Sequence, residues 1–152
     1  MLGAILSALH ILAFGIGLGA VFTRGRALRA LAAGDDRAVS RVLFADNFWG
    51  VAAFLWIASG LLRAFGGIEK SSDFYLFNGF FWVKMGLFGL IFALEGLPMA
   101  TFIGWRFGVR RGQAPDIRAV PKLVRINDVE LALVVAIPFA AAAMARGLWL
   151  LN

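Results

Sequence analysis

The chain has 152 residues, of which 61% are hydrophobic and only 16% are charged. A soluble domain of this length has about half apolar and a quarter charged residues, so this chain has more apolar surface than one soluble core can bury. It has no cysteine, which excludes disulfides and thiolate metal sites. Its net charge of +6 does not indicate nucleic-acid binding, because the basic residues lie mostly in two short connections and no nucleic-acid motif is present.

Four apolar stretches predict an all-α integral membrane protein with a single domain over residues 1–152. We place the spans at about 2–22, 44–65, 79–105 and 126–149, each long enough to cross about 30 Å of hydrocarbon. The first stretch has no basic residue before it and ends at an arginine-rich flank, so we expect a retained span rather than a cleaved signal peptide. Short connections favour an up-down four-helix bundle.

Glycines and prolines predict where these helices end or bend. The first helix is expected to continue past the membrane to Gly34, and the second to run from about Arg37 until Gly66. Pro98 and Pro138 fall within the third and fourth spans, where each removes a backbone hydrogen bond and favours a kink.

The basic residues predict the orientation of the bundle. The connections at 23–43 and 106–125 carry most of them, whereas the connection at 66–78 has only Lys70. The positive-inside rule therefore puts the first and third connections in the cytoplasm and both termini on the outer side. We expect the spans to lie in the lipid bilayer of a bacterial inner membrane.

Charged and polar residues inside the predicted spans are the candidates for function, since each central charge costs about 2.5–3.5 kcal/mol to insert. They are His10, Arg63, Lys84, Glu95, Glu130 and Arg146, with Asp46, Asn127 and Asp128 at the cytoplasmic ends. Helix rise puts His10 near the midplane, the cations toward the outside and the acids toward the cytoplasm.

His10 is the only histidine, and it lies on a small-residue face of the first span. A single midplane imidazole predicts an axial ligand of haem b, with His10 on the iron. The alternative is a histidine that hydrogen-bonds across helices. One histidine without cysteine argues against a protein-only zinc or copper centre.

The cations and Glu95 have similar alternatives. Arg63, Lys84 and Arg146 are expected to clamp an anionic group such as the haem propionates, or else to extend toward outer headgroups. Glu95 is a candidate proton relay or redox-coupled base, or else a hydrogen-bonded neutral acid or ion-pair partner.

Several segments carry a family resemblance. The chain resembles an uncharacterised family of bacterial four-span membrane proteins, domain of unknown function 2214, in Asp46-Asn47-Phe48-Trp49-Gly50, Ser59-Gly60-Leu61-Leu62-Arg63, Phe81-Trp82-Val83-Lys84-Met85 and Met144-Ala145-Arg146-Gly147.

A more distant likeness is to HemJ-type protoporphyrinogen oxidases and CopD-type membrane domains. It is carried by Ala8-Leu9-His10, Trp82-Val83-Lys84 and Arg125-Ile126-Asn127-Asp128, with Asp128 where those families have glutamate. The resemblance implies a haem and redox role for His10 and Lys84.

The leading hypothesis is therefore a small inner-membrane protein that binds haem b for electron transfer or porphyrinogen-type oxidation. His10, Arg63, Lys84 and Arg146 would bind the cofactor, and Lys84 and Glu95 would be catalytic. One alternative is a transport or ion-handling protein, which needs a homo-oligomer because four spans are few for a transporter. Another is a non-catalytic membrane subunit whose buried charges only fix helix pairing.

Overall fold

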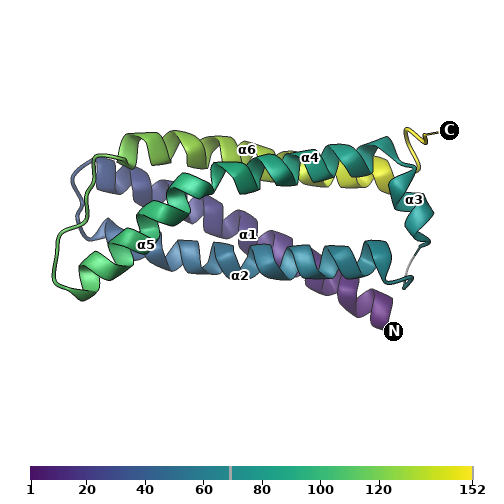
Figure 1. Ribbon diagram of the computed structural model, residues 1–152, viewed down its shortest axis with the longest axis horizontal. Helices are drawn as coiled ribbons and strands as arrows, with labels where there is room; N and C mark the ends of the chain where they lie inside the picture. The colour runs from purple at the N-terminus through teal and green to yellow at the C-terminus, as the bar shows by residue number, and fades with distance from the viewer. Residues whose placement is uncertain (69, 152) are drawn as a thin grey trace.

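The computed structural model describes residues 1–68 and 70–151, which form an elongated helical bundle (Figure 1). Its helices are α1 (Leu2–Ala32), α2 (Ala38–Phe65), α3 (Ser72–Leu76), α4 (Gly79–Leu94), α5 (Gly96–Arg110) and α6 (Val120–Ala145). Both termini lie at one end, called the terminal end; the connections at 33–37 and 111–119 form the opposite, loop end. An even number of antiparallel spans brings both termini to the same end of the bundle.

Within the described residues, four stretches are long and apolar enough to cross a membrane: Leu2–Ala32, Ala38–Phe65, Gly79–Arg110 and Val120–Ala145. The predicted all-α four-helix bundle is confirmed. Many large apolar side chains face outward, and Phe54, Phe92 and Phe139 are each at least 70% exposed. Such a surface is favourable in contact with lipid and unfavourable in contact with water, so these helices contact the lipid bilayer.

The first two helices have the predicted bounds. α1 continues past the first span to Ala32, and Gly34 follows with a φ of +93°, a conformation that side chains other than glycine rarely adopt. α2 ends at Phe65, directly before Gly66.

The third span is broken rather than continuous. α4 ends at Leu94 and α5 begins at Gly96, with Glu95 between them. Pro98 explains the position, because a proline has no N–H for the carbonyl four residues earlier and its ring displaces that carbonyl, here that of Leu94. Beyond the break, α5 turns away from α4 and crosses toward α2 at the loop end (Figure 1). α6, by contrast, continues through Pro138 as one helix.

α6 begins before the predicted fourth span, 126–149, and ends before that span does. α6 begins at Val120, with Pro121 in its first turn, where the missing N–H costs nothing. It ends at Ala145 because Gly147 and Trp149 have φ values of 68° and 58°, which no right-handed helix can accommodate.

The residues after α6 fold back onto the start of α4. The Asn78 side chain accepts a hydrogen bond from the Phe80 N–H at 2.9 Å and donates one to the Leu148 carbonyl at 3.1 Å. The backbone N–H of Gly79 donates to the Trp149 carbonyl at 2.9 Å. Asn78 therefore caps α4 and holds the C-terminal segment in place.

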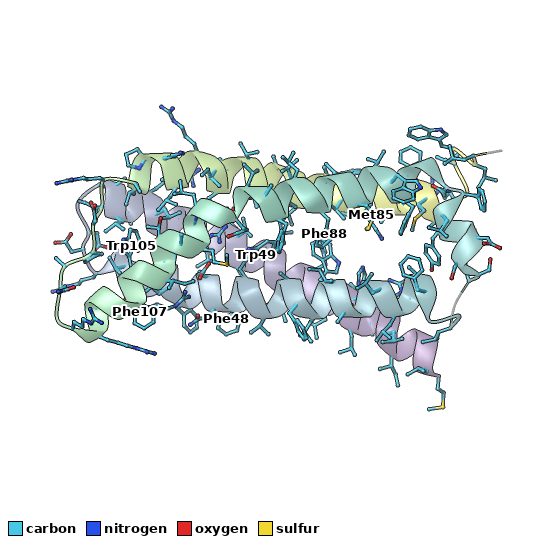
Figure 2. The ribbon with its side chains drawn as sticks, viewed as in Figure 1. Phe48, Trp49, Met85, Phe88, Trp105 and Phe107 are labelled. Atoms are coloured by element: carbon cyan, nitrogen blue, oxygen red, sulfur yellow. The ribbon has the colours of Figure 1, made fainter. Side chains whose placement is uncertain are left out.

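The long helices pack unevenly. α1 packs along α2 and α6, and α4 packs on α6. Between α4 and α2 the space is filled by side chains, among them Phe88, which lies between the two helices in Figure 2 and packs at a tilt against Trp56 with ring centroids 4.7 Å apart. This uneven packing leaves cavities in the terminal half of the bundle.

Candidate functional site

Polar side chains gather at two separate places inside the bundle. Toward the terminal end, His10 of α1 meets α2 beside a cavity. Toward the loop end, Arg24 of α1 lies in a cluster of charged groups from α2, α5, α6 and the α4–α5 break.

Both ring nitrogens of His10 are hydrogen-bonded to α2. The Trp56 indole N–H donates to His10 Nε2 at 3.0 Å, so Nε2 carries the lone pair and Nδ1 the proton. His10 Nδ1 lies 2.9 Å from Ser59 Oγ, which itself donates to the Leu55 carbonyl at 2.6 Å. The imidazole thus links α1 and α2 by hydrogen bonds, as in the hydrogen-bonding alternative.

Gly60 permits this approach of α1 to α2. A Cβ atom at position 60 would lie 3.1 Å from His10 Cε1, closer than an ordinary van der Waals contact. The Ser-Gly pair at 59 and 60 thus supplies a hydroxyl partner and the space for the ring beside it.

A cavity of about 270 Å³ opens beside His10, and we call it the terminal-end pocket. Its polar lining is His10, Arg63, Lys70, Tyr75 and Lys84, and its apolar lining includes Phe14, Trp56, Ile137 and Met144. None of the lining residues in the described part of the chain is acidic. A second cavity of about 290 Å³ shares His10, Trp56, Gly60 and Lys84 and continues along α2 and α4 past Phe88 and Phe92.

The pocket contains some of the residues that the sequence singled out and not others. His10, Arg63 and Lys84 line it, whereas Arg146 is exposed just after α6 and does not. Lys70 and Tyr75 line the pocket without having been singled out, because residues in a connection have no depth that helix rise can estimate.

Arg24 is the centre of the second cluster and is fully buried. Its Nε donates to Asn127 Oδ1 at 2.8 Å, and its Nη1 to Asp46 Oδ1 at 3.2 Å. Its Nη2 donates to both Glu95 Oε1 at 2.8 Å and Glu130 Oε2 at 2.5 Å. We call Arg24, Asp46, Glu95, Asn127, Glu130 and Arg106 the Arg24 cluster.

Arg106 joins this cluster from α5. Its Nη2 donates to Asp46 Oδ2 at 2.7 Å and to Asn47 Oδ1 at 2.8 Å. The turn at Glu95 lets this happen, since α5 leaves the line of α4 and brings Arg106 to α2. The break therefore lets one span contribute two residues to the cluster.

Charged residues of one helix need not lie in the same site. Lys84 and Glu95 are eleven residues apart, about three helical turns, and so lie on one side of the helix. Lys84 nevertheless lines the terminal-end pocket, whereas Glu95 bonds Arg24. On α6, Glu130 is buried against Arg24, whereas Asp128 is exposed and pairs with Arg29. Asp128 and Glu130, two residues apart on α6, thus face different surroundings.

Arg24 belongs to the arginine-rich flank after the first predicted span, and the sequence analysis did not predict its burial. Its position on the helix could have indicated it. Arg24 lies fourteen residues after His10, close to four turns, and Gly17 and Val21 lie between them on the same buried face of α1.

No group of three potential metal ligands among histidine, aspartate and glutamate was found in the described residues.

Comparison with known proteins agrees with the fold and is silent on chemistry. No curated protein and no solved structure matches the chain. The comparisons therefore give no support to the likeness to HemJ-type and CopD-type proteins suggested by the short motifs around His10, Lys84 and Asn127. A family model described as "Predicted membrane protein (DUF2214)" matches residues 2–148, and the chain belongs to that family.

Proposed function

We propose that this protein binds an amphiphilic anion, an acidic head on an apolar body, in the terminal-end pocket. The observation that carries the proposal is Lys84. Its side chain is half-buried on a membrane-spanning helix, faces the pocket, and has no carboxylate within ion-pair distance in the described part of the chain. An ammonium group in such surroundings favours an anionic partner.

The remaining lining supports the same ligand chemistry. Arg63 and Lys70 add positive charge around Lys84, and Tyr75 adds a hydroxyl group. The second cavity is lined almost entirely by apolar side chains and passes residues at the lipid-facing surface, such as Ile57 and Leu61. A head near Lys84 and a body beside Phe88 would let the ligand enter sideways from the bilayer. If the protein lies in a bacterial inner membrane with its basic connections in the cytoplasm, the terminal-end pocket lies in the outer leaflet.

Haem b, the cofactor predicted from the sequence, is one ligand of this class, and its propionates match the cations. Ligation of its iron by His10 does not fit the present arrangement. Trp56 occupies the Nε2 lone pair and the Nδ1 proton faces Ser59, so one of these bonds must break first. The cations support binding of an acid, and they do not by themselves support electron transfer or porphyrinogen oxidation.

The transport alternative predicts joint use of Lys84 and Glu95. Their separation into the pocket and the Arg24 cluster weakens that alternative, since no hydrogen bond or ion pair between described residues links the two sites. The better-supported function is binding at the terminal end.

A pair of probes tests the proposal: a pyrene-labelled long-chain fatty acid and its methyl ester, titrated into detergent-purified protein while tryptophan emission is recorded. We expect the acid to quench with at least tenfold higher affinity than the ester, because only the acid carries charge. Lys84→Met should lower the affinity for the acid about tenfold, the loss of one charge-assisted contact worth about 1.4 kcal/mol. Lys122→Met, which removes an equal charge at the loop end, should leave it unchanged.

Equal binding of acid and ester, or an unchanged affinity in Lys84→Met, would overturn the proposal and favour the non-catalytic subunit. Haemin titrated in the same way distinguishes the haem version. A Soret band that shifts on reduction and is lost in His10→Ala would make haem b the ligand, whereas haemin binding that survives His10→Ala would show an acid held only by the cations.

A further inference from the structure

The Arg24 cluster carries more acids than bases. Asp46, Glu95 and Glu130 bring three carboxyl groups, whereas Arg24 and Arg106 bring two guanidinium groups. The amides of Asn127 and Asn47 are neutral. These are the charged groups contributed by α1, α2, the α4–α5 break, α5 and α6, since the neighbouring Arg29–Asp128 pair is exposed and self-contained.

Glu130 lies at the most enclosed point of the cluster. Its side chain is fully buried, and Oε2 accepts from Arg24 Nη2 at 2.5 Å. Its other oxygen, Oε1, is buried with no hydrogen-bond donor among the described residues. A carboxylate with an unpartnered oxygen in the interior is costly, whereas a protonated acid has a hydroxyl group there that can donate.

Glu95 shares the same arginine nitrogen. Arg24 Nη2 donates to Glu95 and to Glu130, so the two carboxyl groups are held side by side against one N–H-bearing atom. Two adjacent buried carboxyl groups rarely carry full charge together, and commonly share one proton. Glu95 is partly exposed, at 16% of its side-chain surface, and lies at the helix break.

We propose that the Arg24 cluster is a proton-binding site that holds one exchangeable proton between Glu95 and Glu130. The proton balances the three carboxyl groups against the two guanidinium groups. Glu95, at the break between α4 and α5, is the group through which the proton exchanges with solvent, and Glu130 is its buried partner. The site is independent of the terminal-end pocket.

Infrared spectroscopy of the purified full chain tests this, because the carbonyl stretch of a protonated carboxylic acid is separate from that of a carboxylate. Dodecyl maltoside is a suitable detergent, since it has no carbonyl group. At neutral pH we expect one carboxylic acid band per chain, shifted by transfer to D₂O and lost at high pH. Glu130→Gln and Glu95→Gln should each abolish the band, because the two remaining carboxylates are balanced by the two arginines.

Arg106→Gln provides a variant that does not touch either glutamate. Removing one guanidinium leaves three carboxyl groups with a single cation, so the band should grow about twofold. Asp116→Asn, in the exposed connection before α6, is the matched control and should leave the band unchanged. Absence of the band in the unmodified protein at neutral pH, or its survival in both glutamine variants, would overturn the proposal.

Discussion

Gly25 lies directly against Asn127, the side chain that orients the buried guanidinium of Arg24. A Cβ atom at position 25 would stand 2.5 Å from Asn127 Nδ2. That amide donates to the Val21 carbonyl at 3.1 Å while its oxygen accepts from Arg24 at 2.8 Å. The missing side chain at position 25 is therefore what lets α6 bond the backbone and the arginine of α1 together.

Gly25→Ala should destabilise the protein by about 1–3 kcal/mol, the usual cost of overpacking a tight contact. Asn127 must move, and both of its bonds lengthen. The measurement is unfolding by a denaturing detergent, followed by circular dichroism. Gly19→Ala is the control, because open space surrounds that position and alanine favours the helix. Equal stability of the two variants would contradict the prediction.

Arg24→Met should destabilise the protein by about 3–5 kcal/mol, because it leaves the buried carboxyl groups without their central cation. The same unfolding assay measures it. Arg29→Met removes a cation only five residues away, but its pair with Asp128 is exposed, so we expect a loss below about 1 kcal/mol. A small effect at Arg24, comparable with that at Arg29, would show that the cluster does not stabilise the bundle.

Trp56→Phe should cost about 2–3 kcal/mol, since it removes the hydrogen bond to His10 Nε2 and puts a smaller ring at a buried position. It also frees the Nε2 lone pair beside the pocket. If haem binds here, haemin should show a stronger Soret shift with Trp56→Phe than with the unmodified protein. Trp82→Phe is the control, as that ring is exposed on α4 and its N–H bonds the Leu76 carbonyl. No difference between the two variants would argue against ligation by His10.

Asn78→Ala should loosen the C-terminal segment from α4. The Asn78 side chain caps α4 by accepting from the Phe80 N–H, and it also donates to the Leu148 carbonyl. Loss of such a cap costs about 1 kcal/mol. Hydrogen exchange should become faster at the backbone amides of Gly79 and Leu151, which bond across the same contact. Ser71→Ala serves for comparison, because Ser71 precedes α3 without a side-chain cap bond. Unchanged exchange in Asn78→Ala would mean that the backbone bonds suffice.

Much of the architecture was readable from the sequence, because bilayer thickness and backbone chemistry leave few options for a chain this apolar. Span number, the glycine stops after α1 and α2, and the break upstream of Pro98 follow from local rules. The end of α6 did not, since the turn at Gly147 and Trp149 is held by Asn78 and Gly79, about seventy residues away in the chain.

The candidate site divides in the same way. Helix rise placed Arg63 and Lys84 toward the outer end of the bundle and His10 near the midplane, and all three line the terminal-end pocket. Which cation lies near which acid was decided only by the tertiary structure, because α5 leaves the axis of α4 at Glu95. Glu95 bonds Arg24, whose hydrogen-bond partners come from three other segments, namely α2, the α4–α5 break and α6. Local sequence fixes where a charge lies along a helix, whereas its partner depends on how the helices cross.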